Sequence, residues 1–256
     1  MRYLEVSRSG GPRTAAEGPN AAGDRTHLRS VAMAVQHNPG QVRLARAFFA
    51  RPVLEVAPEL LGCTVSHAGV TVRLTEIEAY DGSNDPGSHA FRGPTARTRV
   101  MFGEPGGLYV YFTYGMHWCA NLVCGSVGVA NAVLLRAGEV IEGLEVAASR
   151  RAGVIDRDLA RGPACLAKAL SLGRVHNGID TISADSAVVV RAPIRGSSSG
   201  ASGAVMRTGP RVGVSGPGGD AAAYPWRFWL EGEPTVSAYR PGTARLRKPA
   251  VPPTGP

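Results

Sequence analysis

Lysine is nearly absent from this chain of 256 residues, which contains only Lys168 and Lys248. Enzymes that form a Schiff base need an amine nucleophile, usually lysine, so the sequence offers few residues for that chemistry. The phosphate-binding Walker loop is missing, and so is a G-x-G-x-x-G run after a strand. The H-x-E and P-C-x-x-C signature of zinc deaminases is missing too. These absences argue against a nucleotide-binding protein that uses either of these common motifs and against a zinc-dependent deaminase.

Cysteine is scarce, and no long apolar run is present. Cys63, Cys119, Cys124 and Cys165 form no C-x-x-C pair, which disfavours a zinc site or a disulfide framework and predicts small buried thiols in a reducing compartment. No apolar run approaches the roughly 18 residues of a membrane span. Residues 1–35 lack the apolar segment and cleavage site of a secretory signal, so we expect a cytoplasmic protein that does not enter a membrane.

The net charge of +8 is concentrated at the two ends of the chain. Residues 1–51 carry eight arginines and three acids, and residues 240–256 carry three arginines, one lysine and no acid. The stretch between them is close to neutral. Basic ends favour a polyanionic partner, because each phosphate contact releases counterions. Solvated tails of an arginine-rich protein would explain the same charge equally well.

Composition divides the chain into three segments. Residues 1–41 are basic, rich in Gly, Arg, Ser and Ala, and have little apolar periodicity, so we predict that they are disordered. The basic tail 241–256 is proline-rich and is not expected to fold. A single folded domain over residues 42–240 remains, and a hydrophobic content of 44% is enough for a sizeable core.

The pattern within this domain mixes short helices with antiparallel strands. Helices are expected at 45–49, at 56–61 with Pro58 near the start, at 140–151, and at 157–172 with a break at Gly162-Pro163. Alternating β-branched residues predict a hairpin over 62–80 that turns at His67–Gly69. Further strands are predicted at 106–114, 118–124, 132–137, 188–192, 208–214 and 226–230, with a flexible loop over 197–203. The fold class is α+β: a compact domain with a curved antiparallel sheet and peripheral helices.

Two carboxylates stand out in the apolar strand TEIEAY at 75–80. Glu76 and Glu78 are two residues apart, so they share one face of the strand. An apolar strand that keeps two acids must usually pair them or use them, for example to activate water during hydrolysis at an acetal-like carbon. Arg136 interrupts the apolar run AVLLRA at 132–137 and is the obvious partner for Glu78. A solvated outer face of the hairpin is the alternative interpretation.

Aromatic and polar residues nearby suggest that one pocket surrounds these acids. Tyr109 and Tyr111 share a strand face and can stack on a base, and Tyr114 lies at a hairpin tip, where an aromatic can wedge into a base step. His89 lies in a loop, and Asn121 lies in a strand where asparagine is disfavoured. The stretch 86–103 also contains arginines but no acid before Glu104, so it could hold phosphates. Each of these signals is also compatible with an ordinary core strand or a solvated loop.

At these residues the sequence resembles the alkyladenine (3-methyladenine) DNA glycosylase family. The resemblance runs in order across about residues 42–237. It is carried by TEIEAY at 75–80, SHAFRG at 88–93, MFGEPGGLYVYFTYGMHWCAN at 101–121, AVLLRAGE at 132–139, RGP at 161–163, GPRVGVS at 209–215 and PWRFWL at 225–230. The family's fold also occurs as the C-terminal domain of formyltransferases, where it binds RNA.

The resemblance implies a role for each matching residue. Glu78 matches the general base that deprotonates the attacking water, and Arg136 matches the arginine that helps to hold that water. Tyr80, His89 and Tyr111 match the residues that sandwich a flipped base. Tyr114 matches the side chain that intercalates into the DNA stack, and Asn121 matches the residue that disfavours the 2-amino group of guanine. Thr95, Arg97 and Arg99 are expected to contact the DNA backbone.

The implied function is removal of alkylated or deaminated purines, such as 3-methyladenine, from double-stranded DNA, leaving an abasic site. With so little lysine, water is the simpler nucleophile, so we expect a monofunctional enzyme without a lyase step. The resemblance further implies a bacterial-type, nucleoid-associated monomer that needs no metal or organic cofactor.

The sequence departs from the family pattern in two places, and two alternative functions stay open. Ala164-Cys165 stand where the family usually has lysine, so a phosphate or structural contact there is either lost or supplied by Lys168. Pro94 and Ala96 stand where the resemblance leads us to expect arginine and proline, which concerns DNA binding more than the chemistry. The alternatives are a non-catalytic nucleic-acid-binding module of the same fold, and a sugar glycosidase using both acids. The three tryptophans lie far from the acids in sequence, which disfavours the glycosidase.

Overall fold

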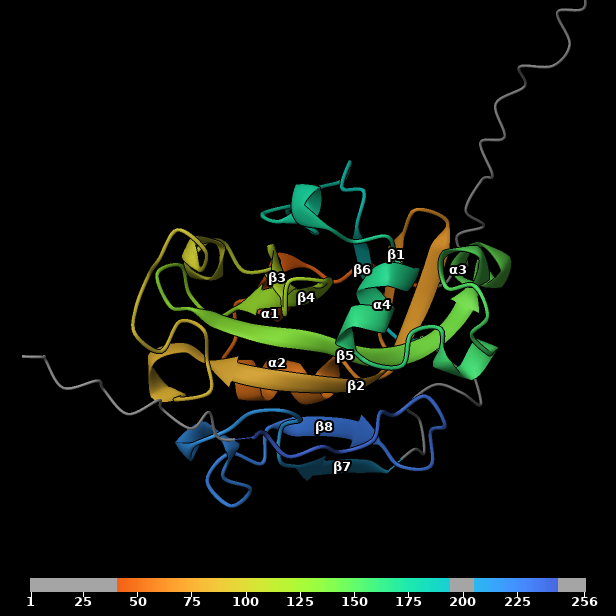
Figure 1. The fold of residues 1–256 in the computed structure, drawn as a ribbon. Helices are drawn as coiled ribbons and strands as arrows, with labels where there is room; N and C mark the ends of the chain where they lie inside the picture. Colours follow the sequence, from red (N-terminus) through yellow and green to blue (C-terminus); the bar gives the residue numbers. More distant parts are fainter. Residues whose placement is uncertain (1–40, 194–204, 244–256) are drawn as a thin grey trace, which may run out of the picture. The chain divides into compact units, whose positions relative to one another are not determined.

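The computed structural model describes residues 41–193 and 205–243, and these form an α+β fold around an open antiparallel sheet (Figure 1). The α-helices are α1 (Arg46–Phe49), α2 (Val53–Glu59), α3 (Leu144–Arg150) and α4 (Pro163–Ala169). The strands are β1 (Thr64–His67), β2 (Val70–Asp81), β3 (Leu108–Thr113), β4 (His117–Cys124), β5 (Asn131–Glu142), β6 (Val189–Arg191), β7 (Met206–Gly209) and β8 (Arg227–Leu230). No helix within the described ranges is long and apolar enough to cross a membrane.

Strand β2 is the central strand of the sheet and pairs with β1, β5 and β8. The strand order is β3-β4-β5-β2-β1-β6, and β8 pairs with β2 while β7 pairs with β8. All these pairings are antiparallel, and β5 follows β2 along nearly its whole length. The β2–β5 register shifts on both sides of Glu76, and such irregularities bend a strand and raise its twist. The middle of β2 is therefore enclosed by β5 on one side and β8 on the other.

The first predicted hairpin is confirmed. Strands β1 and β2 pair from Thr64↔Arg73 to His67↔Val70, with Ala68 and Gly69 between them. Both linking residues have positive φ, 48° and 79°, which is the backbone of a two-residue hairpin turn. The predicted strands at 106–114, 118–124, 132–137, 188–192 and 226–230 also exist, with shifted ends.

The predictions for helices 140–151 and 157–172 were wrong at their starts. Strand β5 continues to Glu142 because it stays paired with β2, and α3 begins only after Gly143, whose φ is 73°. Residues 159–161 are not helical, since Ala160 accepts a hydrogen bond from the Gly138 amide and Arg161 bridges to β5. Helix α4 then begins at Pro163, close to the predicted break.

Two further boundaries need correction. Helix α2 begins at Val53, so Pro58 lies inside it near its end rather than near its start. The strand predicted at 208–214 ends at Gly209, because Pro210 has no amide hydrogen to continue the pairing. The chain then turns towards β2. Nearly all of the predicted disordered segment 1–41, the loop 197–203 and most of the tail 241–256 lie outside the described residues.

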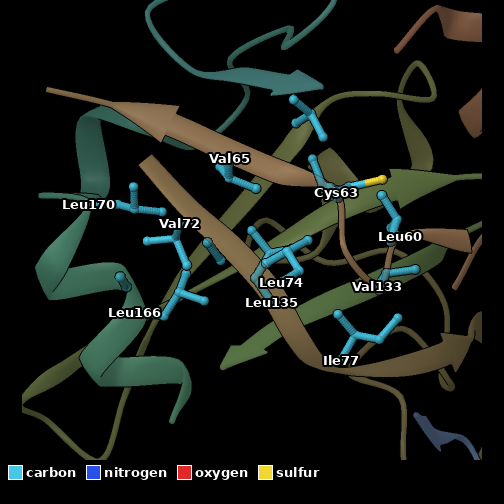
Figure 2. Close-up of a cluster of buried hydrophobic side chains, with 14 of the residues drawn as sticks. Leu60, Cys63, Val65, Val72, Leu74, Ile77, Val133, Leu135, Leu166 and Leu170 are labelled. Carbon is cyan, nitrogen blue, oxygen red and sulfur yellow. The ribbon is translucent and has the colours of Figure 1, made fainter. Parts of the chain in front are cut away.

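The main hydrophobic core lies between the sheet and its helices. Buried residues of α2, α4, β1, β2 and β5 form one cluster, part of which Figure 2 draws. The labelled members are Leu60, Cys63, Val65, Val72, Leu74, Ile77, Val133, Leu135, Leu166 and Leu170. Burying a leucine or valine side chain contributes about 1.5–3 kcal/mol. This packing fixes β2 and β5, the two strands that carry Glu78 and Arg136.

Candidate active site

A cavity of about 640 Å³ opens between β2–β5, the β3–β4 hairpin and the segment 212–215. Its volume is typical of a small-molecule site. Seven of the residues predicted from the sequence line it: Glu78, Tyr80, His89, Tyr111, Tyr114, Asn121 and Arg136. They come from four strands, a hairpin tip and a loop, so the fold gathers residues that are spread along the chain from Glu78 to Arg136.

Glu78 lies on the cavity wall, although its side chain is completely shielded from bulk solvent. The Val212 amide donates to Oε1 at 2.7 Å, and the Tyr80 hydroxyl donates to Oε2 at 2.9 Å. Arg136 Nε lies 3.5 Å from Oε1. Burial raises the pKa of Glu78, while Arg136 and the two hydrogen bonds oppose that rise. A carboxylate can accept about four hydrogen bonds, so one more donor, such as water, can still bind.

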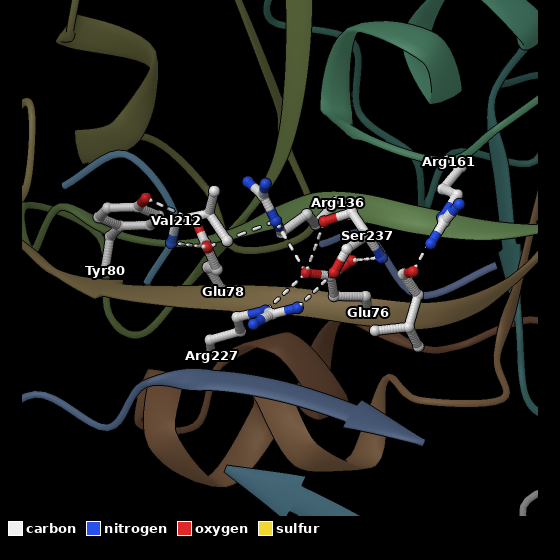
Figure 3. A network of polar contacts seen from close by, with 9 residues as sticks. Glu76, Glu78, Tyr80, Arg136, Arg161, Val212, Arg227 and Ser237 are labelled. Carbon is white, nitrogen blue, oxygen red and sulfur yellow. Dashed lines mark hydrogen bonds and ion pairs between the residues drawn. The ribbon is translucent and has the colours of Figure 1, made fainter. Parts of the chain in front are cut away.

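Glu76 occupies the same strand face but has a different environment (Figure 3). Its carboxylate accepts hydrogen bonds from Arg136 Nε at 2.8 Å and Arg227 Nε at 2.6 Å. Ser237 donates from both its backbone amide, at 2.7 Å, and its hydroxyl, at 3.0 Å. The structure therefore excludes the alternative of a solvated outer face. It also refines the predicted pairing, since Arg136 lies closer to Glu76 than to Glu78.

Arg136 links the two carboxylates and also lines the cavity. Only its Nε is used by protein: among the described residues, neither terminal guanidinium nitrogen donates a hydrogen bond to a protein group. Figure 3 shows these nitrogens pointing away from Glu76. They are thus available to hold a ligand or a water molecule beside Glu78.

Aromatic rings form another wall of the cavity. The rings of Tyr109 and Tyr111 stack with centroids 5.4 Å apart, and the His89 ring meets Tyr111 edge-on at 4.7 Å. Burial of the histidine ring, assisted by the nearby charge of Arg97, lowers the pKa of His89 to about 4. Burial likewise raises the pKa of Tyr80 and Tyr111. All three side chains are therefore neutral at physiological pH, and they offer flat faces on which a planar ring can stack.

Asn121 and Tyr114 mark the inner and outer parts of the cavity. Asn121 is buried, and its amide nitrogen donates to the Tyr109 carbonyl at 3.1 Å, which fixes the side chain. Tyr114 lies at the tip of the β3–β4 hairpin and is 81% exposed. Its φ of 52° is unusual for a residue that is not glycine. This conformation costs free energy, which the surrounding hairpin must offset.

The three residues expected to contact DNA phosphates lie outside the cavity lining. Thr95 is used in a turn, where its hydroxyl and that of Thr98 are 2.9 Å apart. Arg99 is exposed. Arg97 is also exposed, and its guanidinium lies over the Tyr111 ring at 5.2 Å. Arg97 is therefore closer to the aromatic wall than the sequence predicted.

Several residues that build the site were not predicted from the sequence. Arg227 and Ser237 hold Glu76, the Val212 amide holds Glu78, and Arg211 packs beneath Tyr80. Arg227 carries a usable signal, because it interrupts the apolar run PWRFWL at 225–230, as Arg136 interrupts AVLLRA. Arg211 lies between Pro210 and Val212 in a stretch with several glycines and gives no such signal. Val212 acts through its backbone, so its side chain gives no indication of this contact.

The arrangement can activate water next to a stacked planar ring. A buried carboxylate can accept a proton from water, and a neighbouring guanidinium can orient that water and stabilise negative charge.

The described residues contain no group of three or more His, Cys, Asp or Glu side chains that could hold a metal ion. The four cysteines are all unpaired, and Cys119 also lines the cavity.

Comparisons with known proteins agree on one family. The profile of the family described as Methylpurine-DNA glycosylase (MPG) matches residues 47–234. A protein of Streptomyces avermitilis is 52% identical over 220 residues, covering 82% of this chain and 98% of the relative. Relatives from Frankia casuarinae and Leifsonia xyli subsp. xyli are each 51% identical, and each comparison covers 76% of this chain and 92% of the relative. All three carry the provisional name 3-methyladenine DNA glycosylase.

Proposed function

Because the chain belongs to the methylpurine-DNA glycosylase family and is a DNA glycosylase, we propose that it removes alkylated or deaminated purines from double-stranded DNA and leaves an abasic site. Its substrates would include 3-methyladenine, which the names of its relatives mention. The observation that carries this proposal is the buried carboxylate of Glu78 in a cavity with aromatic walls. The match over residues 47–234 supports a glycosylase domain at about 42–240.

Base flipping is the first step of the proposed reaction. The damaged nucleotide rotates out of the duplex, and Tyr114 fills the gap that it leaves in the stack. Tyr80, His89 and Tyr111 then sandwich the purine, and Asn121 restricts what can occupy its edge. Thr95, Arg97 and Arg99 hold the backbone on either side. The exposed position of Tyr114 and the rings of the cavity wall support these assignments.

Hydrolysis follows in the cavity. Glu78 accepts a proton from a water molecule as that water attacks C1′, while the C–N bond breaks through an oxocarbenium-like state and the base leaves. Arg136 orients the water through its free terminal nitrogens. A positioned general base typically contributes about 10²- to 10⁴-fold to the rate.

We propose that the enzyme is monofunctional. Within the described part of the chain, no lysine lines the cavity, and Lys168 is exposed on α4. Among the residues that the structure describes, no amine is thus in place to form a Schiff base with the sugar. We further propose that the enzyme acts as a monomer, and that its DNA substrate associates it with the nucleoid of a bacterial-type cell.

The alternative is a non-catalytic nucleic-acid-binding module of the same fold, like the RNA-binding C-terminal domain of formyltransferases. That function would leave the buried Glu78, with its three surrounding donors, without a use. No observation at the site favours it over the glycosylase.

Base release from duplex oligonucleotides tests the proposed function. Each duplex carries one hypoxanthine or one N3-methyladenine, and the products are followed with and without alkali. We expect free base, with strand cleavage only after alkali. Strand cleavage without alkali would contradict the monofunctional assignment. Tight binding without base release from either lesion would support the binding module.

A further inference from the structure

Arg211 is fully buried, yet the reaction proposed above gives it no role. Its guanidinium binds the carboxylate of Asp85 through two nitrogens, at 2.5 and 2.6 Å. The same nitrogens donate to the carbonyls of Ala79, at 2.9 Å, and Gly218, at 2.8 Å. A buried charge is costly unless it is paired in this way, and these four contacts hold the guanidinium in one position.

The contacts of Arg211 reach two groups that surround Glu78. Its guanidinium carbon lies 4.5 Å from the centroid of the Tyr80 ring, which supports the ring whose hydroxyl donates to Glu78. The next residue in the chain is Val212, whose amide donates to the other oxygen of Glu78. Fixing Arg211 therefore fixes both hydrogen-bond donors of the carboxylate.

Asp85 extends the connection to a third part of the site. Its carboxylate accepts hydrogen bonds from the backbone amides of Asp81, at 3.3 Å, and Gly87, at 2.8 Å. These bonds shape the loop between β2 and His89, which lies on the cavity wall. Gly87 packs so closely on the Arg211 guanidinium that a β-carbon there would collide with it. One ion pair thus joins the end of β2, the His89 loop and the segment that carries Val212.

We propose that Arg211, held by Asp85, is a positioning residue for base release: it keeps the Tyr80 hydroxyl and the Val212 amide on Glu78 and so keeps this carboxylate oriented. The proposal rests on the proposed function, in which Glu78 is the general base. Arg211 does not line the cavity, so it acts through Tyr80 and Val212 rather than on the substrate.

The predicted consequence is a change in the pH at which the enzyme works. Charged and titratable groups face Glu78 from every element around it: Glu76 and Tyr80 on β2, Tyr111 on β3, Cys119 on β4, Arg136 on β5, Arg227 on β8, and Arg211. Only the donors Tyr80 and Val212 depend directly on Arg211. Losing them would raise the pKa of Glu78 further, because hydrogen bonds to a carboxylate favour its ionised form.

The test measures single-turnover release of hypoxanthine against pH for Arg211→Lys, Arg211→Met and Asp85→Asn. We expect rates at neutral pH to fall by roughly 10²-fold, as small misplacements of a catalytic group can cause. We also expect the acid limb of the pH profile to move up by roughly one to two units, with partial recovery at alkaline pH. Arg211→Lys keeps the charge but loses the bidentate ion pair with Asp85, so its rate and its acid limb should lie between those of wild type and Arg211→Met.

Arg73→Met is the matched control. Arg73, on β2, is also a buried arginine, and it pairs with two acids, Glu139 and Glu233, but it does not line or support the cavity. Its loss should lower stability and leave the pH profile of the folded fraction unchanged.

An unshifted acid limb in folded Arg211→Lys and Asp85→Asn would overturn the positioning role, even if Arg211→Met failed to fold. Glu78→Gln separates this failure from failure of the proposed function. If Glu78→Gln releases the purine at the wild-type rate, Glu78 is not the general base. If Glu78→Gln is inactive and the acid limb of the Arg211 and Asp85 variants is unshifted, only the positioning role is wrong.

Discussion

At the scale of single residues, two neighbouring glutamates on one strand face have different environments. Glu76 is surrounded by four donors and pairs with two arginines, whereas Glu78 keeps access to the cavity. Their spacing in the sequence predicted a shared face, and the structure confirms it. The division of roles depends on Arg227 and Ser237, which lie 151 and 161 residues away in the chain, so no local pattern could reveal it.

Base release should fall as the pH drops through the pKa of Glu78. Burial raises this pKa above its ordinary value, and the general base must be ionised, so activity is present above the pKa and lost below it. The pKa of His89 is about 4, so His89 is already neutral over this range. Single-turnover rates across a pH series should therefore show the same acid limb in wild type and in His89→Gln. Loss of the limb in His89→Gln would contradict the assignment to Glu78.

Glu76→Gln should destabilise the fold strongly. The substitution removes the charge that Arg136 and Arg227 share, and breaking a buried ion pair from one side costs about 3–5 kcal/mol. Urea unfolding measures this loss. Glu231→Gln is the control, because Glu231 pairs with Arg207 in an exposed position and its loss should cost less than about 1 kcal/mol. Equal losses in the two variants would contradict a structural role for Glu76.

At the scale of secondary-structure elements, the β2–β5 pair and the β3–β4 hairpin position the site. Alternating β-branched and aromatic residues predicted these strands well. The alternation did not show that β2 and β5 are buried on both faces along most of their length. Element ends were predicted less well. The end of β5 depends on its partner β2, and the start of α4 depends on how residues 159–161 pair with β5. Both are tertiary effects that a local pattern does not contain.

Replacing Tyr114, at the tip of the β3–β4 hairpin, should raise stability and lower activity. Tyr114 has a positive φ of 52°, so Tyr114→Gly should relieve strain and raise the free energy of unfolding by up to about 1 kcal/mol. The same change removes the ring proposed to intercalate, so base release should slow. Ser171→Gly is the control, since Ser171 has a φ of 54° but does not line the cavity. It should stabilise the protein without slowing base release; an equally slow Ser171→Gly would argue against a special role for Tyr114.

At the scale of the whole molecule, composition predicted little about the partner or the site. Net charge was as compatible with solvated basic tails as with a polyanionic partner, and the cavity is made by segments from β2 to residue 240 that only folding brings together. The resemblance to known glycosylases supplied the identity of seven lining residues. It did not indicate the ion pair of Arg211 with Asp85, because it implied no role for Arg211 within GPRVGVS at 209–215, and Asp85 lies outside the matching segments.

The salt dependence of DNA binding tests the proposed backbone contacts. Arg99 is exposed, and removing one phosphate-binding side chain should reduce the slope of log affinity against log salt by about 1. Arg99→Gln should therefore weaken binding to undamaged and damaged duplexes alike and flatten the slope. Arg157→Gln, which removes a surface arginine paired with Asp158, should leave the slope unchanged. An unchanged slope in Arg99→Gln would remove Arg99 from the interface.

The most direct test of the central claim is single-turnover hypoxanthine release by Glu78→Gln, with binding of the same lesion duplex measured in parallel. Glutamine keeps the size of the side chain and can still accept the Val212 hydrogen bond, but it cannot take a proton from water. We expect binding close to that of wild type and base release slower by about 10²- to 10⁴-fold. Base release at the wild-type rate would contradict this claim.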